Sequence, residues 1–192
     1  MCGRYYVDDT MSREIEKLVG QLDRKLLIEG EICPGQEASV IIQEEGKAVI
    51  CRMSWGYPSQ QNKGLIINAR SESALQKPMF SESVMNRRCI IPAGWFYEWD
   101  RDKNKITFRH GEKKGMFLAG FWKYFSDGRR FVILTTEANT CISSVHSRMP
   151  LILSGEESVK WLKDEEMYKQ LLALRPDTPL EKEGFMQERL PF

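Results

Sequence analysis

The second residue of this sequence is a cysteine, in Met1-Cys2-Gly3-Arg4, and its position has chemical consequences. Cysteine is small enough for removal of the initiator methionine, which would make Cys2 the mature amino terminus. Such a residue carries an α-amine and a thiol on adjacent carbons, so it can condense with an aldehyde to a five-membered thiazolidine. With reference pKa values of about 7.7–8.0 and 10.4, the α-amine is roughly 300-fold richer in free base than lysine at pH 7. The alternative is an ordinary, frayed chain start.

Two further residues are candidates for moving protons. Glu98 lies in the aromatic run Trp95–Trp99, where strand periodicity places it on one face with Phe96. Partial burial there would raise its pKa toward a value useful for proton transfer, whereas an edge glutamate would point into water. His146, with a reference pKa of about 6.5, is the better histidine candidate, although a lone histidine is more often structural. His110 falls in a polar turn and is assigned to the surface.

Polar side chains also stand where strands are expected to end. Asn68 and Arg70 follow an apolar strand, which would hold them rigidly. Arg70 is suited to grip a phosphate in bidentate fashion, or else to pair with Glu72. Thr136 offers a hydroxyl to a phosphate, although turns and helix caps use such residues equally often.

Scattered arginines and one aromatic segment complete the set of candidates. Arg4 and Arg148 are candidate phosphate contacts, with solvated surface as the default interpretation. Trp55, in Trp55-Gly56-Tyr57-Pro58, could stack on bases or belong to the core.

The elements that would position these residues are many short strands with helices near both ends. Apolar spacing predicts a helix over 11–22, and a capping box at Ser154 and Glu157 predicts helical structure toward residue 174, before Pro176. Residues 71–87, interrupted by Pro78, are typical of short helical turns. Strands are expected at 39–42, 49–55, 65–68, 89–91, 95–99, 106–108, 116–122, 131–135 and 151–153. The pattern predicts an α+β domain over residues 1–192, with a mixed or barrel-like sheet and flanking helices.

Composition limits the class of protein. The chain has 192 residues, a net charge of +1 and five widely spaced cysteines without a C-x-x-C pair, so neither a disulfide framework nor a zinc site is expected. Near-neutral charge excludes a strong global attraction to nucleic acid, so any DNA contact must be local. Without a leader or an apolar run long enough to span a bilayer, we expect a protein without membrane contact that is cytoplasmic, or nuclear in a eukaryote, and associated with the nucleoid if bacterial. We also expect a monomer.

Several segments, taken in order, closely resemble the SOS-response-associated peptidase family of abasic-site processing proteins. They cover residues 2 to about 153: the start Met1-Cys2-Gly3-Arg4, then residues 68–72, 88–92, 95–99, 135–139 and 146–150. Each motif is weak alone, but the ordered set is specific. The match is incomplete after Trp55, because residues 55–58 are shorter than in the family and no tryptophan follows in 59–64.

The resemblance implies a function in the DNA-damage response. Such proteins recognise abasic sites in single-stranded DNA and shield them by covalent linkage. It implies an autoproteolytic peptidase with cross-linking and lyase-type activity, in which Met1 is removed and Cys2 forms the thiazolidine. The catalytic positions would be Cys2, Asn68, Glu98 and His146, and the DNA contacts Arg4, Arg70, Trp55, Thr136 and Arg148. No metal or organic cofactor is implied.

Two other classes of function remain open on the residues alone. Cys2 and His146 suit a cysteine peptidase or amidohydrolase that acts on other substrates. Aromatic and basic residues suit a non-catalytic single-strand binder, whose salt-sensitive binding would not depend on Cys2.

Overall fold

The computed structural model describes residues 2–59 and 63–184, and its centre is a closed five-stranded barrel. Around the ring, β12 contacts β4, then β3, β8 and β11 follow, and β11 returns to β12. Of the five strand contacts that close the ring, the one between β4 and β12 is parallel and the others are antiparallel, so the barrel is mixed. Its strands are β3 (Glu37–Glu44), β4 (Lys47–Trp55), β8 (Arg88–Ala93), β11 (Met116–Phe125) and β12 (Gly128–Glu137).

The chain leaves the barrel after β4 and returns beside β12, the strand that β4 also contacts. Gly56 turns the chain with a φ of 104°, a conformation that favours glycine, and its N–H donates to Phe131 O at 2.8 Å. A small hairpin of β5 (Tyr57–Pro58) and β6 (Leu65–Ile66) follows. β7 (Asn68–Arg70) then pairs in parallel with β12, farther along that strand than β4 does. This excursion fixes Asn68 against the barrel wall.

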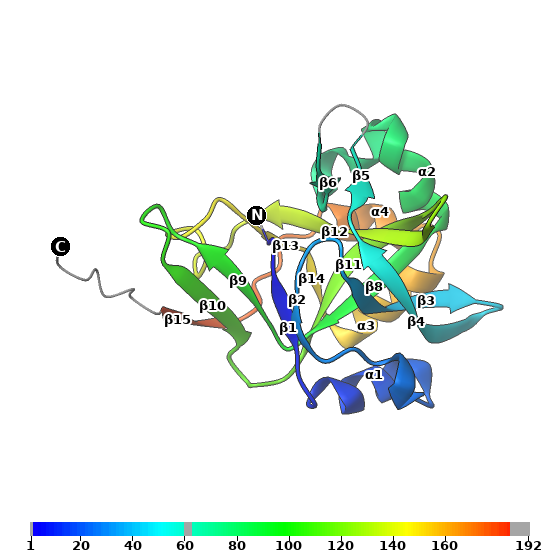
Figure 1. The fold of residues 1–192 in the computed structure, drawn as a ribbon, viewed down its shortest axis with the longest axis horizontal. Coiled ribbons are helices and arrows are strands. Elements are labelled where there is room, and N and C mark those ends of the chain that lie inside the picture. Colours follow the sequence, from blue (N-terminus) through cyan, green and yellow to red (C-terminus); the bar gives the residue numbers. More distant parts are fainter. Residues whose placement is uncertain (1, 60–62, 185–192) are drawn as a thin grey trace.

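A second, antiparallel sheet lies beside the barrel, in the order β15-β10-β9-β1-β2. Figure 1 shows β9, β10 and β15 on the left of the molecule, with β1 between them and the barrel. The strands are β1 (Tyr5–Val7), β2 (Gly30–Ile32), β9 (Trp95–Trp99), β10 (Lys105–His110) and β15 (Leu180–Gly184). The first strand therefore brings the start of the chain to Glu98's strand.

Helices and short strands cover the rest of the barrel. Met11 and Ile15 bury one side of the first helix, which ends at Gly20 with a positive φ. Ser154 and Glu157 form the capping box that begins the third helix. The helices are α1 (Met11–Val19), α2 (Pro78–Asn86), α3 (Gly155–Lys163) and α4 (Met167–Leu172), with 3₁₀ turns at Arg24–Leu26 and Ser71–Gln76 and strands β13 (Arg148–Pro150) and β14 (Ile152–Leu153). In the described ranges, none of the helices has the length and apolar character needed to cross a membrane.

The structure confirms the predicted α+β class and the mixed barrel. The predicted helix at 11–22 ends three residues early, and the C-terminal helical region is two helices separated after Lys163. Strands β1, β2, β5, β13 and β15 were not predicted, because strands of two or three residues and the charged β15 show no apolar alternation. The single strand expected at 65–68 is two short strands, β6 and β7. The part of the atypical segment at residues 60–62 lies outside the described residues.

Candidate active site

Cys2 lies just before β1 and is completely buried. Its thiol donates weakly to Arg4 O at 3.8 Å, and its carbonyl accepts a hydrogen bond from Asn68 Nδ2 at 2.9 Å. Burial, and after it the charge of nearby Glu98, raise the pKa of the Cys2 thiol well above its ordinary value. The sulfur is therefore protonated at neutral pH and needs a base before it can act as a nucleophile.

Asn68 is positioned by the barrel and by Trp55. As the first residue of β7 it stands opposite Ile133 of β12, and Trp55 Nε1 donates to the preceding carbonyl, Ile67 O, at 3.0 Å. Trp55 also packs on Tyr5, with ring centroids 5.2 Å apart. Asn68 Oδ1 is buried and accepts no hydrogen bond from the described residues. An acceptor is thus held beside Cys2.

Glu98 is 2% exposed, on the face of β9 that also carries Phe96. Burial raises the pKa of its carboxyl, and the electrostatic influence of His146 lowers it by less. The interpretation of Glu98 as an edge residue pointing into water is therefore wrong. Since the carboxyl also raises the pKa of Cys2, the two groups are electrostatic neighbours.

His146 lies in the loop between β12 and β13, and its ring orientation is set by the backbone of Arg148. Nδ1 accepts from Arg148 N–H at 2.9 Å and lies 3.2 Å from Arg148 O. Which contact forms depends on the tautomer, because Nδ1 accepts from Arg148 N–H when it carries no proton and donates to Arg148 O when it carries one. Nδ1 therefore has a backbone partner in either tautomer.

The assignment of His110 to a surface turn is wrong. His110 is the last residue of β10, is 8% exposed, and accepts at Nδ1 from Glu112 N–H at 3.1 Å. Burial lowers its pKa. It has a structural position at the strand end.

Arg4 and Arg70 are the expected phosphate contacts that remain accessible. Arg70 is exposed at the end of β7. Arg4 is half-buried, pairs with Glu31 at 3.1 Å, and lies over the ring of Trp99 at 5.4 Å from its centroid.

Glu72, which was considered as a partner for Arg70, instead pairs with Arg148. The two terminal nitrogens of Arg148 donate to the Glu72 carboxylate at 2.7 and 2.8 Å, and one of them also donates to Thr135 O at 2.6 Å. This hydrogen bonding lowers the pKa of Glu72. From the sequence, Glu72 was considered only as a partner for Arg70. The pairing of β13 with β12 brings Arg148 to Glu72, and this pairing could not be predicted from the sequence.

The structure places Trp55 and Thr136, which were expected to contact DNA, inside the fold. Both are 0% exposed. Trp55 packs between Tyr5 and Phe131, and Thr136 Oγ1 donates to Leu174 O at 3.2 Å. Trp55 supports the residues around Cys2 from inside the fold.

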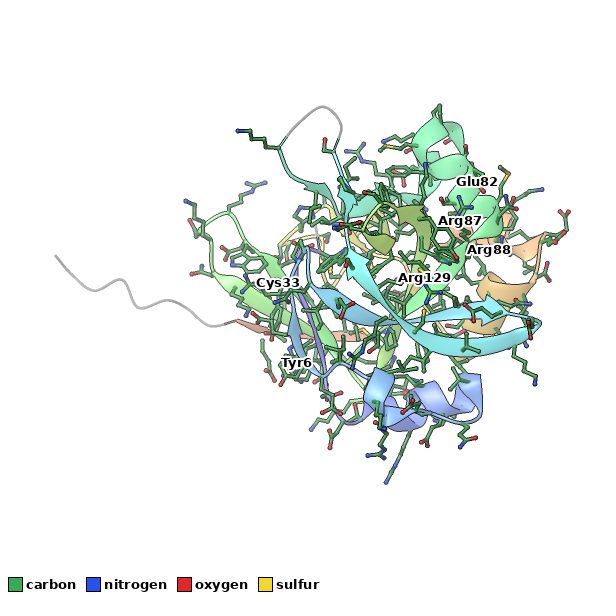
Figure 2. All side chains as sticks on the ribbon, turned by 45° about the vertical axis from the view of Figure 1, so that its right-hand side comes forward. Tyr6, Cys33, Glu82, Arg87, Arg88 and Arg129 are labelled. Atoms are coloured by element: carbon green, nitrogen blue, oxygen red, sulfur yellow. The ribbon has the colours of Figure 1, made fainter. Side chains whose placement is uncertain are left out.

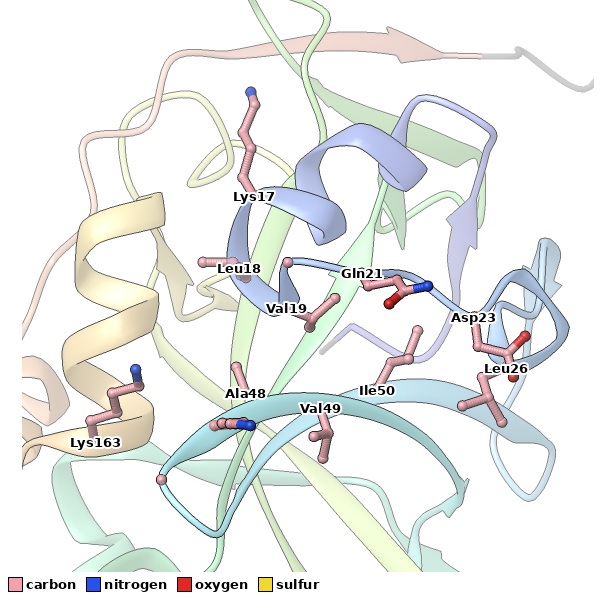
Figure 3. Close-up of a pocket in the computed structure, with 13 residues that line it drawn as sticks. Lys17, Leu18, Val19, Gln21, Asp23, Leu26, Ala48, Val49, Ile50 and Lys163 are labelled. Atoms are coloured by element: carbon pink, nitrogen blue, oxygen red, sulfur yellow. The ribbon is translucent and has the colours of Figure 1, made fainter.

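The hollow shown in Figure 3 is separate from this site. It has a volume of about 570 Å³ and lies between the end of α1 and the β3–β4 hairpin. Val19, Ala48 and Val49 line it together with Lys47 and Lys163. The candidate catalytic residues are not among its lining. In residues 2–59 and 63–184, no three acidic, histidine or cysteine side chains gather as metal ligands would.

Comparisons with known proteins identify the family of this chain. The family model described as SOS response associated peptidase (SRAP) matches residues 1–185. The chain is 32% identical over 183 residues to the abasic site processing protein YoqW of Bacillus subtilis, covering 84% of this chain and 80% of YoqW. It is 25% identical over 179 residues to the abasic site processing protein YedK of Escherichia coli, covering 86% of this chain and 81% of YedK.

Solved structures support the fold. A crystal structure of a Bacteroides thetaiotaomicron protein superposes with a TM-score of 0.81 at 21% identity, covering 97% of this chain and 93% of that one. With the family match over almost the whole sequence, the conclusion is direct: this chain belongs to the SOS response associated peptidase (SRAP) family.

Proposed function

We propose that this protein processes abasic sites in single-stranded DNA by forming a thiazolidine between Cys2 and the ring-opened sugar. The observation that carries the proposal is the burial of Cys2 against two polar neighbours, the amide of Asn68 and the carboxyl of Glu98. The relatives named as abasic site processing proteins supply the substrate class.

The first step is removal of Met1, which lies outside the described residues. The family name attributes a peptidase activity to such proteins, and we propose that this chain removes its own Met1. Removal converts the amide nitrogen of Cys2 into the α-amine that the chemistry needs. The hydrogen bond from Asn68 to Cys2 O holds the new terminus in place.

The second step is capture of the sugar aldehyde. The α-amine adds to C1′, and loss of water leaves an imine. The Cys2 sulfur then bonds to C1′ while its proton passes to the nitrogen, so one aldehyde and one aminothiol give one thiazolidine and one water. The raised pKa of the thiol calls for a base, and Glu98, whose own pKa is raised by burial, is suited to carry this proton.

His146 and Asn68 complete the proposed machinery. His146, electrostatically coupled to Glu98, exchanges protons with the sugar oxygen as the ring opens. Asn68 Oδ1 is a buried acceptor suited to the α-amine or a sugar hydroxyl. Arg4, Arg70 and, on release from Glu72, Arg148 are the proposed phosphate contacts.

The test uses the purified full chain and an oligonucleotide with one abasic site. Intact mass should show loss of one methionine, and denaturing gels should show a stable adduct. Cys2→Ala and Cys2→Ser should both abolish that stable adduct, and once Met1 is removed either variant should form only an imine that borohydride can trap. Cys33→Ala, which removes a half-buried free thiol elsewhere, is the matched control and should retain full yield. Full adduct from Cys2→Ala would refute the proposal.

Adding generic peptides and an undamaged oligonucleotide to this experiment separates the other two functions. A cysteine peptidase acting on other substrates would turn over generic peptides, yet burial raises the thiol pKa rather than lowering it as such a nucleophile needs. A non-catalytic binder would hold intact and abasic strands equally and form no adduct.

A further inference from the structure

One face of β9 carries three aromatic rings, and the opposite face carries Glu98. Strand alternation places Trp95, Tyr97 and Trp99 together on the side away from Phe96 and Glu98. Tyr6 of β1 stacks on Trp95 with centroids 4.1 Å apart and planes within 4°. Trp95 Nε1 donates to Tyr97 OH at 2.7 Å, so neighbouring rings are tied together.

A cation lies over each of these three rings. Arg4 stands 5.4 Å from the Trp99 centroid, Lys105 Nζ 3.7 Å from that of Tyr97, and the Arg109 guanidinium 3.6 Å from that of Trp95. We call Arg4, Lys105 and Arg109 the cation row. Contact with ring faces limits where these long side chains can go, which reduces the entropy lost when they bind an anion.

The row begins two residues along the chain from Cys2, on the face of β9 opposite Glu98. Arg4 is two residues from Cys2, and Lys105 stands opposite Trp99 while Arg109 stands opposite Trp95. Lys105 and Arg109 are four residues apart on one strand, which is about 13 Å at roughly 3.3 Å per residue. The positive charges thus follow β9 away from Cys2, over a distance suited to several linked phosphates.

The present partners of the row are carboxylates that solvent reaches. Glu31 pairs with Arg4 at 3.1 Å and with Lys105 at 2.9 Å, and Glu183 approaches Arg109 at 4.0 Å. The Glu31 and Glu183 side chains are 36% and 66% exposed. Such pairs contribute little stability, so a phosphate can replace the carboxylate at small cost.

We propose that the cation row binds the phosphate backbone of the single-stranded DNA that flanks the abasic nucleotide. This inference rests on the proposed function, since it extends the DNA path from Cys2 along β9. Three linearly arranged cations that begin two residues along the chain from the reactive residue match a regular polyanion, and the near-neutral chain has no general attraction that would replace them. Because the rings are covered by the cations, the row reads backbone and not base sequence.

The test measures binding of an undamaged single-stranded oligonucleotide at several salt concentrations. The double variant Lys105→Gln/Arg109→Gln removes two phosphate contacts. Each contact on a single strand contributes about 0.7 to the magnitude of the slope of log affinity against log salt, so that magnitude should decrease by about 1.4. Glu31→Gln, which frees Arg4 and Lys105, should bind more tightly than wild type. The matched control Lys47→Gln/Lys163→Gln removes the same charge at the hollow in Figure 3 and should bind as wild type.

Flank length supplies the second measurement. Wild type should cross-link an abasic nucleotide faster when it has a long flank than when it has one neighbour on each side, and the double variant should lose this advantage. An unchanged salt slope, or an equal loss in the control, would overturn the cation row as a DNA track. Polyglutamate serves as a probe for an acidic protein partner. If the double variant loses binding to polyglutamate but keeps binding to the oligonucleotide, the row binds an acidic protein, and the proposal is overturned. Absence of any wild-type adduct would refute the proposed function. The salt dependence of oligonucleotide binding would still test whether the cation row binds DNA.

Discussion

Among single residues, we expect ionised Glu98 to lower the stability of the fold and to support the cross-linking reaction. Because burial raises its pKa, the folded chain keeps this proton at pH values where the unfolded chain has lost it. Stability therefore falls as pH rises from the ordinary glutamate pKa toward the raised one. Glu98→Gln cannot ionise, so its Tm should exceed that of wild type at pH 7–8 and match it below pH 4. Its cross-linking rate should fall by about 10²–10⁴-fold, the usual contribution of a positioned proton carrier.

Thermal denaturation across pH and single-turnover gels measure these two effects. Glu37→Gln, at an exposed position on β3, is the control and should change neither. A Glu98→Gln variant that is less stable than wild type by the same amount at pH 4 and pH 8 would show that ionisation of Glu98 costs nothing in the fold.

Among the elements, the junction of α2, α3 and β8 depends on one buried arginine. Arg88 donates to Trp161 O at 2.5 Å and to the carbonyls of Val84 and Met85, and its guanidinium lies 4.6 Å from the Tyr168 ring centroid. Figure 2 shows Arg88 where α2 approaches the C-terminal helices. It therefore satisfies carbonyls at the ends of two helices. Arg88→Met should reduce the free energy of unfolding by about 3 kcal/mol, since these acceptors lose their donors.

Urea denaturation provides the measurement, read as a lower midpoint at unchanged slope. The matched control is Arg129→Met, which removes an arginine paired with exposed Glu44 and should cost about 0–1 kcal/mol. Equal costs at the two positions would contradict the role given to Arg88.

Over the whole molecule, the segment after α4 ties the barrel to the second sheet. Asn139, beyond β12, donates from Nδ2 to Pro176 O at 3.4 Å and to Thr178 O at 3.2 Å, and β15 then pairs with β10. This connection holds the loop that bears His146 against the sheet that bears Glu98. Asn139→Ala should cost about 1–2 kcal/mol and speed amide exchange in β15.

Hydrogen exchange with mass analysis of peptides from β15 and from β3 makes the comparison. Asn139→Asp keeps the acceptor that Cys141 N–H uses at 3.1 Å but lacks the two donors, so it should resemble Asn139→Ala in β15. Faster exchange in β3 and β15 alike would indicate global destabilisation and would contradict a local tie.

The sequence by itself determined those features that one segment of chain decides. Apolar alternation predicted β4, continuous aromatic and apolar runs predicted β9 and β12, and the hydroxyl and carboxylate three residues apart predicted the beginning of α3. The face shared by Glu98 and Phe96 follows from the twofold repeat of any strand. The chemistry available to Cys2 follows from its residue type and its position behind Met1.

Only the tertiary structure decided which distant segments meet. β1 and β2 have three residues each, too few to show a period, and they exist because β9 and each other satisfy their backbone groups. The partner of Glu72 and the burial of Trp55 and Thr136 likewise depend on β7 and β13 joining β12. Local patterns record what a residue prefers, whereas hydrogen bonding and packing between strands far apart in sequence select its actual neighbours.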